Sequence, residues 1–433
     1  MVKTKKSSKR KSIHIILVFT ATLSITLLIG LSALYIYEHT LRTDELKKQS
    51  DNLVNILAEM NTAGEMVAAS ELTESVNEIE ETEPDDTPPP ARYADILSDP
   101  EYMRENRIYA REAIVPGEAR FLFGGDILFD SYYAVMATAI QRGGTVDKAF
   151  SDDLLEMMHQ ADVMMLNNEF TYTKRGEPYP EKQFVFRANP DKAAWLNDMG
   201  VNLVSLANNH TFDYGEISLL DTLDTLESHG VPYVGAGRNI DEASAPAYFI
   251  ISDIKIAVIA ATQIERLDNP DTRGATPTLP GVFRCMNPDL LLKVVAEAKE
   301  NSDFVIVFLH WGAENVDQPD WLQLEQGLKI AAAGADLIVG AHPHCLQGIT
   351  YHGATPVAYS LGNFWFSSRP VDTGLLEAII DQNGLKTLRF IPALQKNCFT
   401  SLVYDQEKAR ILTTMRTLSP NITIDEEGVI TPN

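Results

Sequence analysis

The feature that most constrains the fold of this chain is a repeated pattern: a short apolar run ends in polar residues, and an amphipathic stretch often follows. Such runs are typical of β-strands buried on both faces of a sheet. The runs are RFLFGGD (120–126), DVMMLNNE (162–169), VNLVSLANNH (201–210), KIAVIAATQ (255–263), DFVIVFLHWG (303–312), DLIVGAHPH (336–344) and PVAYSLGNF (356–364). Helices are expected at 193–200, 219–230, 288–301 and 322–334, and several of them close on glycine. The pattern predicts a mixed α/β domain.

A different signal follows in the last part of this domain. The stretch GLLEAIIDQNGLKTLRFIPALQ holds two β-rich runs around Asn383 and Gly384, and Asn-Gly between such runs favours a hairpin. We therefore expect antiparallel strand pairs late in the domain. The main domain is predicted at 118–400, and residues 401–433 are predicted to be a C-terminal extension.

The N-terminus carries the signature of a membrane anchor. Lys and Arg residues between Lys3 and Lys11 precede an apolar stretch from Ile13 to Tyr37 that carries no Asp, Glu, Lys or Arg. A helix of about 20 apolar residues crosses a bilayer, and the apolar part of a cleaved signal peptide is shorter. The sequence predicts a cytoplasmic basic tail at 1–12 and a transmembrane signal anchor at 13–37. The protein would cross the cell membrane once, with its main domain extracellular. Whether the anchor is cleaved stays open.

Residues 38–117 are predicted to form a stalk and an acidic, Pro-rich linker. Within them, 71–90 is acidic, ends in three prolines and has few large apolar side chains, so we expect it to be disordered. The formal net charge of the whole chain is −24, which argues against a nucleic-acid partner held through phosphate contacts.

Polar side chains of one chemical kind gather where the apolar runs end. In α/β sheets, ligands bind outside the carboxyl ends of the strands. Carboxylate, imidazole and amide groups together suit a catalytic-type site for Mn, Fe or Zn, and no cysteine pair has zinc-finger spacing. The strand ends supply Asp126, Asn167, Asn168, Glu169, Asn208, Asn209, His210, His310, His342, His344 and Asn363.

The strongest local signal is GAHPH, because residues i and i+2 of an extended segment face the same side. Pro343 is expected to hold His342 in extended geometry, so that the two imidazoles point one way. Other members of the set have plain structural alternatives. Asp126 after two glycines also fits a tight turn, and the Asn-Asn-His run also fits an Asn-rich turn. A single histidine such as His310 is often a structural residue.

The chemistry of such a site follows from its ligand types. Two close cations bridged by a carboxylate would polarise a phosphoryl or acyl oxygen. His210 is expected to donate a proton to a leaving group, and Trp311 to form a wall of the site. Arg187 could hold an anionic substrate, although an ordinary surface arginine is the default interpretation.

On these residues the sequence resembles the CapA family, also called PgsA, of poly-γ-glutamate capsule synthesis proteins. The shared motifs are GGDILFD, NNEF, LANNHTFDYG, GAGRN, HWG, GAHPH and SLGNF, which run in this order from about 124 to 364. The resemblance implies the calcineurin-like metallophosphatase superfamily, a four-layer αββα sandwich and one or two divalent ions. The metal ligands that it implies are Asp126, Glu169, Asn209, His310, His342 and His344. The implied catalytic residues are His210 and Asp213. The candidate substrate-binding residues are Asn168, Arg187, Asn208, Trp311 and Asn363.

Two positions depart from the superfamily pattern. Leu128 stands where the first motif has a metal-binding histidine, and Glu169 stands where the bridging residue is aspartate. Leucine does not bind metals, so one of the two metal positions is affected.

Three functions are compatible with the sequence. The first is a membrane-anchored component of capsule or polyanion synthesis or export, which works with other capsule synthesis subunits and an anionic polymer. The second is a metal-dependent hydrolase of the cell envelope that acts on phosphoester or amide bonds. The third is a non-catalytic binding module that retains the metal-site residues.

Overall fold

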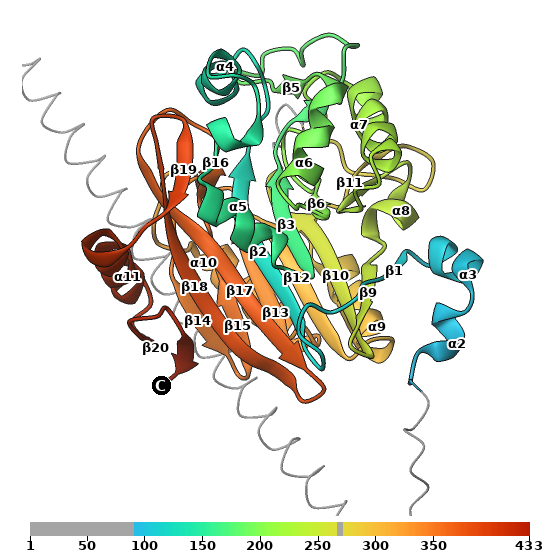
Figure 1. The fold of residues 1–433 in the computed structure, drawn as a ribbon. Coiled ribbons are helices and arrows are strands. Elements are labelled where there is room, and N and C mark those ends of the chain that lie inside the picture. Colours follow the sequence, from blue (N-terminus) through green and yellow to red (C-terminus); the bar gives the residue numbers. More distant parts are fainter. Residues whose placement is uncertain (1–90, 266–271) are drawn as a thin grey trace, which may run out of the picture. The chain divides into compact units, whose positions relative to one another are not determined.

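The computed structural model describes residues 91–265 and 272–433 (Figure 1). The predicted basic tail, signal anchor and acidic linker therefore lie outside the described residues. Within the described part of the chain, no helix is long and apolar enough to span a bilayer.

Two large β-sheets form the body of the molecule. The first sheet has seven strands in the order β1 (Ile108–Ala110), β9 (Ala247–Ile251), β10 (Ile254–Thr262), β12 (Phe304–His310), β13 (Leu337–Ala341), β15 (Thr355–Ala358) and β14 (Ile349–His352). The second has β19 (Phe399–Leu402), β18 (Gly384–Lys396), β17 (Val371–Asp381), β2 (Ala119–Ile127), β3 (Val163–Asn168), β6 (Leu203–Ser205) and β7 (Tyr233–Val234), with β16 (Asn363–Trp365) beside β2. Strands β17 and β18 form the antiparallel hairpin predicted around Asn383 and Gly384.

The remaining elements are helices and short strand pairs. The helices are α2 (Ala94–Leu97), α3 (Pro100–Glu105), α4 (Ala134–Gln141), α5 (Asp152–His159), α6 (Ala194–Asp198), α7 (Glu216–Ser228), α8 (Ile240–Ser244), α9 (Asp289–Glu300), α10 (Trp321–Ala332) and α11 (Asp405–Leu418), with 3₁₀ turns at Val146–Lys148 and Pro190–Ala193. The short pairs are β4 (Thr171–Tyr172) with β5 (Arg187–Ala188), β8 (Ala236–Gly237) with β11 (Gly281–Val282), and β20 (Ile422–Ile424) with β21 (Ile430–Pro432). The four helices expected from sequence correspond to α6, α7, α9 and α10.

Three apolar clusters define the layers. One lies between the two sheets and contains Phe123 and Phe308 from their facing sides. A second joins the outer face of the eight-stranded sheet to α4, α5, α6 and α7, and a third joins the outer face of the seven-stranded sheet to α9 and α10. Each sheet is thus covered on both faces, which explains why its strands read as continuous apolar runs. Figure 1 shows β17 and β18 in front of β12 and β13.

One expected strand is split between the two sheets. The run at 356–364 forms β15 in the seven-stranded sheet and β16 in the other, so the single strand predicted there is wrong. The chain turns between them at Gly362, whose φ is +67°. This crossing places Asn363 opposite Asp126 in the register of β16 and β2.

The folded unit is wider than the predicted range 118–400. On the N-terminal side, β1 pairs with β9, although residues 91–117 were expected to belong to the linker. On the C-terminal side, α11 places Ile411, Leu412 and Met415 in the core between the sheets. Residues 401–433 therefore contribute to the core of the same unit.

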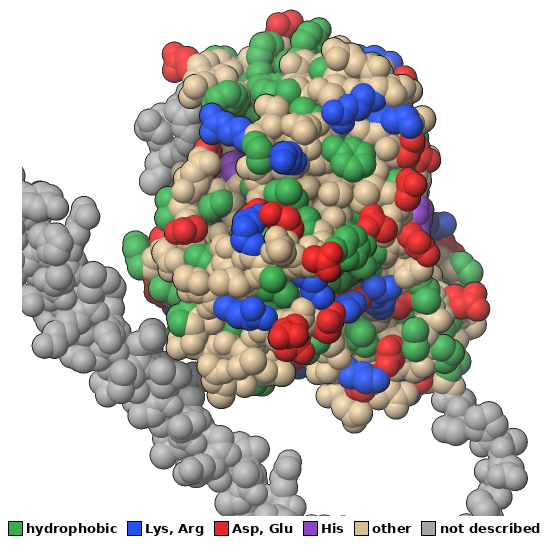
Figure 2. Space-filling view, turned by 60° about the vertical axis from the view of Figure 1, so that its left-hand side comes forward, with side chains coloured by type: hydrophobic (Ala, Val, Ile, Leu, Met, Phe, Trp, Pro, Cys, Tyr) green, Lys and Arg blue, Asp and Glu red, His purple; other side chains and the backbone are tan. Residues whose placement is uncertain are grey.

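The surface carries charges of both signs. In the space-filling view of Figure 2, Lys and Arg side chains are interspersed with Asp and Glu side chains over the visible face. Neither sign dominates that face.

Candidate metal centre

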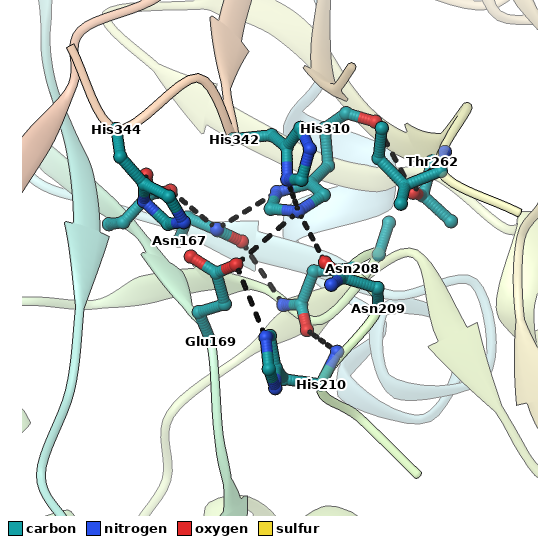
Figure 3. Close-up of polar contacts among 12 residues, drawn as sticks. Asn167, Glu169, Asn208, Asn209, His210, Thr262, His310, His342 and His344 are labelled. Carbon is teal, nitrogen blue, oxygen red and sulfur yellow. Dashed lines mark hydrogen bonds and ion pairs between the residues drawn. The ribbon is translucent and has the colours of Figure 1, made fainter. Parts of the chain in front are cut away.

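The carboxyl ends of the parallel strands of both sheets meet at one edge and bring the predicted polar residues together (Figure 3). Asp126 lies opposite Asn167 in the pairing of β2 with β3, and His310 lies opposite Thr262 in the pairing of β12 with β10. His342 and His344 follow the end of β13. The site is built from both sheets, as strand-end chemistry predicts.

Asp126 is in a strand, so the alternative of a tight Gly-Gly-Asp turn does not apply. The Asp126 N–H donates to the carbonyl of Gly362 at 3.0 Å. Gly125 lets these two chain segments approach, because a Cβ at 125 would lie 1.7 Å from that carbonyl oxygen. The glycines of the GGD motif thus allow β2 and the segment before β16 to come into contact.

Glu169 lies at the middle of the site. Its side chain is fully buried, and neither carboxylate oxygen has a hydrogen-bond partner. Its Oε1 is 3.5 Å from His310 Nε2 and 4.0 Å from His210 Nε2. A buried carboxylate without partners costs several kcal/mol unless a cation or a proton satisfies it.

Two groups of possible metal ligands share Glu169. The first combines it with His310 and His342, and the second with Asp126 and His344. In each group the ligand atoms lie within 4.8 Å of one another. A carboxylate common to both groups is the arrangement expected of a bridging ligand in a two-metal site.

In the first group, three ligand atoms converge on one point. Asn209 Oδ1 lies 2.8 Å from His310 Nε2, and His342 Nδ1 lies 3.0 Å from the same nitrogen. Two imidazoles, an amide oxygen and a carboxylate suit Mn, Fe or Zn. The side-chain oxygen of Asn209 therefore lies beside this group.

In the second group, His344 is held between two oxygens. Its Nδ1 lies 3.1 Å from Asp126 Oδ2 and 2.8 Å from Asn363 Oδ1. Leu128 is fully buried in the apolar cluster under α4 to α7 and does not face this group. Asn363 instead places an oxygen beside His344.

The backbone of the two histidines differs from the extended segment that the sequence predicts. His342 has φ = +99° and His344 has φ = +57°, so Pro343 does not hold His342 extended. Left-handed backbone at residues other than glycine costs about 1–3 kcal/mol and persists where the surroundings require it. The prediction of extended geometry is wrong, although the rings still meet, with centroids 5.8 Å apart.

Two buried asparagines fix the surroundings of the ligands. Asn167 donates from Nδ2 to Asp126 Oδ1 at 2.8 Å, and the same nitrogen lies 3.2 Å from His310 Nδ1. Asn208 donates to Asn167 Oδ1 at 3.2 Å and to the carbonyl of Asn168 at 2.9 Å, and its own Oδ1 accepts from the His210 N–H at 3.0 Å. Asn167 thus connects the two ligand groups, and Asn208 orients Asn167.

His210 is part of a buried chain of charged groups. Its Nδ1 lies 2.7 Å from Asp213 Oδ2, and Lys182 Nζ lies 2.6 Å from Asp213 Oδ1. Lys182 also donates to the carbonyl of Asn209. The Phe186 ring packs against the imidazole of His210, with centroids 4.2 Å apart. The geometry leaves His210 Nε2 directed at Glu169.

Burial sets the protonation of the site. It lowers the pKa of His310 and His342 well below the usual value, and neighbouring histidines add to the effect. Burial, reinforced by the charge of Asp126, raises the pKa of Glu169 well above its usual value. Burial also lowers the pKa of His210, against the opposing charge of Asp213. The imidazoles are therefore neutral at pH 7, the form in which histidine binds metals.

His344 has the opposite shift. Burial acts to lower the pKa of His344, but the hydrogen bond to Asp126 and the charge of Asp126 together outweigh it and raise this pKa. A cation in the second group would compete with the proton on His344.

The predicted substrate residues have different outcomes. The prediction that Trp311 forms a wall of the site is wrong. Trp311 is fully buried in the outer cluster under α9 and α10, and its indole N–H donates to the carbonyl of Tyr359 at 2.8 Å. Side chains alternate along a strand, so His310 faces the centre and Trp311 the opposite side. Asn168 and Asn208 are also buried, and both donate to backbone carbonyls. Arg187 is partly exposed and stacks on Tyr214, with its guanidinium carbon 4.4 Å from the ring centroid.

Sequence reasoning missed Lys182, Phe186 and Phe366. Phe366 packs against His344 with ring centroids 4.8 Å apart, and it contacts Phe186 at 5.5 Å. Lys182 and Phe186 lie in the stretch EKQFVFR, which carries no strand-end motif. The signal that the sequence offered was that this stretch ends at Arg187, which was already a candidate.

The sequence profile of the family described as "Bacterial capsule synthesis protein PGA_cap" matches residues 120–368, more than half of the 433 residues. The matched region contains every predicted metal ligand. The chain belongs to this family of bacterial capsule synthesis proteins.

Curated relatives point the same way. The chain is 31% identical over 229 residues to PGA biosynthesis protein CapA of Bacillus subtilis (strain 168), covering 52% of this chain and 59% of that protein. It is 32% identical over 228 residues to capsule biosynthesis protein CapA of Bacillus anthracis, covering 51% of this chain and 54% of that protein. It is 27% identical over 209 residues to a probable polyglutamine synthesis accessory protein of Mycobacterium tuberculosis, covering 47% of this chain and 55% of that protein. The chain thus spans little more than half the length of these relatives.

A solved structure of a 5'-nucleotidase from Candida albicans matches with 10% identity and a TM-score of 0.33, covering 71% of this chain and 60% of that one. This similarity is too low to carry an argument about the present chain.

Proposed function

We propose that this protein acts in the synthesis or export of an acidic capsule polymer of the poly-γ-glutamate type, and that it does so through a centre for one or two divalent ions. Its family and the functions for which its relatives are named support the capsule role. The single observation that carries the metal centre is Glu169, a buried carboxylate with no hydrogen-bond partner that is shared by two groups of ligands. The sequence motifs resemble those of calcineurin-like metallophosphatases, and this resemblance agrees with the carboxylate and imidazole ligands around Glu169.

The residues present fit a divalent cation. Glu169, His310, His342 and Asn209 would hold one ion, which suits Mn, Fe or Zn. Asp126, Glu169 and His344 would hold a second, with Asn363 beside them in place of the histidine that Leu128 replaces. When bound, these ions supply positive charge that polarises a phosphoryl or acyl oxygen.

The protein's own residues would position and transfer a proton. Asp213 holds Nδ1 of His210, so the second nitrogen, Nε2, faces the centre. Because burial lowers the pKa of His210, the imidazole is neutral at pH 7 and accepts a proton at Nε2. This role differs from the proton donor expected from sequence, since His210 must first take up a proton before it can deliver one.

A hydrolase of phosphoester or amide bonds is the second candidate function. The buried Lys182–Asp213–His210 chain favours it, because a purely structural metal centre has no need of a histidine oriented by a carboxylate. Turnover of a phosphoester such as p-nitrophenyl phosphate, or of γ-glutamyl amides, would be measured with wild-type protein and with His210→Gln. Turnover that His210→Gln leaves unchanged would contradict this role of His210.

Membrane attachment and an extracellular location belong to the proposal. The apolar stretch 13–37 next to a basic cluster supports them. Protease treatment of intact cells that express the full chain would degrade the main domain if it lies outside. Complete protection, with digestion only after lysis, would contradict the proposed topology.

The capsule role is tested in the host organism. Deletion of the gene should lower the surface-bound glutamate polymer, and wild-type protein should restore it. The double variant His342→Ala/His344→Ala should fail to restore it at equal protein level. Unchanged polymer in the deletion strain would refute the capsule role, and full rescue by the double variant would refute the role of the centre.

A further inference from the structure

A second polar pocket lies beside the candidate metal centre. It has a volume of about 410 Å³, and its lining includes Glu265, Thr272, Arg273, Thr276, Arg284 and Asn287. None of these residues belongs to the two ligand groups. Among the described residues of the lining, two arginines and one glutamate give a positive balance of charge.

The pocket contains an unsatisfied donor. Thr272 is 2% exposed, and its hydroxyl has no hydrogen-bond partner. A buried hydroxyl without a partner is unfavourable, and a bound acceptor would remove this cost. Together with two guanidinium groups, this hydroxyl calls for a ligand that accepts hydrogen bonds and carries negative charge.

The arginines are held at the rim by specific contacts. The Arg284 side chain passes close to Gly274: a Cβ at position 274 would lie 2.7 Å from Arg284 Nε. Its ion pair with Glu265 is long, at 3.4 Å. Arg273 donates to the Tyr179 hydroxyl at 3.3 Å and lies 6.0 Å from the centroid of that ring. Both guanidinium groups keep N–H donors available to a ligand.

Two structural routes connect the pocket to the metal centre. The backbone of Arg284 forms an isolated β-bridge with that of Thr262. In the next strand of the sheet, Thr262 lies opposite His310. Two strand spacings of about 4.8 Å place the backbones of Arg284 and His310 roughly 10 Å apart. On the other side, the N–H of Tyr179, the partner of Arg273, donates to the carbonyl of Asp213 at 2.8 Å.

We propose that this pocket is an oxyanion subsite that binds a carboxylate of an acidic polymer while a neighbouring segment of the same chain occupies the metal centre. An α-linked residue advances about 3.5 Å, and a γ-linked glutamate unit has two more main-chain atoms, so about two units span the separation. The proposal rests on the proposed function for the identity of the polymer. It also explains how a protein with a net charge of −24 binds a polyanion, because the attraction is local.

The test is calorimetric binding of a γ-linked glutamate pentamer to the full-length chain in the presence of a chelator, which isolates the pocket from the metal centre. Arg273→Gln and Arg284→Gln should each weaken binding on the order of tenfold. Glu265→Gln should strengthen binding several-fold, because it removes the negative charge next to Arg284. Arg104→Gln, an exposed arginine on α3, is the matched control and should bind like wild type.

The tighter binding expected of Glu265→Gln cannot result from misfolding, because a misfolded protein would not bind the pentamer more tightly. Inorganic phosphate is the second probe. Pentamer binding that both Arg variants leave unchanged would overturn the subsite, and so would phosphate binding without pentamer binding. Loss of metal in His342→Ala/His344→Ala is measured separately, so failure of the metal centre and failure of the subsite are distinguishable.

Discussion

At the scale of single residues, Glu169 is the side chain on which the candidate centre depends. It is buried without a hydrogen-bond partner, and it is common to both ligand groups. In the absence of metal, such a carboxyl group is most stable when protonated. Binding of a cation would therefore displace a proton from Glu169.

This predicts a pH dependence of folding for the metal-free protein. Because the pKa of Glu169 is raised, the folded state keeps a proton that the unfolded state releases above the ordinary pKa of about 4.3. The stability from Glu169 is full below that pH and is lost as pH rises towards the raised pKa. With a chelator present, the free energy of unfolding of wild type should fall relative to that of Glu169→Gln as pH rises above the ordinary pKa of glutamate towards the raised pKa of Glu169. Urea unfolding measures it, and a pH-independent difference would contradict the burial argument.

Lys182 provides a second prediction at this scale. It pairs with the fully buried Asp213, and its own side chain is only 6% exposed. Lys182→Met would leave the Asp213 charge buried with one partner fewer, at a cost of about 3–5 kcal/mol in unfolding free energy. Lys174→Met, which removes an exposed cation, is the control and should change little. Equal stability of the two variants would show that the Lys182–Asp213 pair contributes nothing to the fold.

The types of the ligand residues and their positions at strand ends could be predicted from sequence, but the backbone conformation of these residues could not. Strand-end position alone indicated Asp126, Glu169 and His310. His342 and His344 have positive φ, which no local sequence pattern encodes. The prediction for Trp311 failed because the sequence does not show whether an aromatic side chain next to a site residue faces the site or the core.

At the scale of elements, the contact between β2 and the segment before β16 positions Asp126 and Asn363. The chain passes here from one sheet to the other, and Gly125 allows the carbonyl of Gly362 to approach β2. The sequence predicted a single strand over 356–364, because an apolar run does not reveal that its two halves belong to different sheets. The division is decided by long-range pairing with β13 and β2.

Gly125→Ala tests this contact. The new Cβ would overlap the carbonyl oxygen of Gly362, so the two segments must separate. We expect a loss of at least about 1–3 kcal/mol in unfolding free energy and weaker metal binding, because Asp126 moves with its strand. Gly117→Ala is the control: its φ is +84° but a Cβ there meets no neighbour, so it should cost only about 1 kcal/mol and leave metal binding intact. Unaltered metal affinity in Gly125→Ala would show that the contact does not position Asp126.

Helix α11 tests the C-terminal boundary. Leu412 lies in the core between the sheets with 1% exposure, whereas its neighbour Thr413 is exposed. Leu412→Ala should lower the free energy of unfolding by about 2–5 kcal/mol, and Thr413→Ala should change it by less than about 0.5 kcal/mol. Thermal or urea unfolding measures both. A small effect of Leu412→Ala would mean that residues 401–433 are a detachable extension after all.

At the scale of the whole molecule, two covered sheets bring their strand ends to one edge, and the candidate centre takes ligands from both. The mixed α/β class and the order of main strands and helices were predictable, because strands covered on both faces leave continuous apolar runs in sequence. The assignment of strands to two sheets was not predictable from periodicity, since both sheets produce the same pattern. The roles of 91–117 and 401–433 in the fold also depend on contacts with distant strands.

Metal analysis of the purified full-length chain tests whether Glu169 joins two metal positions. Elemental analysis after equilibration with Mn, Fe or Zn should find up to two ions per wild-type chain. His344→Ala should lose the ion held with Asp126, His310→Ala the ion held with His342, and Glu169→Gln should weaken both. A wild-type chain that retains no divalent metal, or a Glu169→Gln variant that retains as much as wild type, would contradict the account.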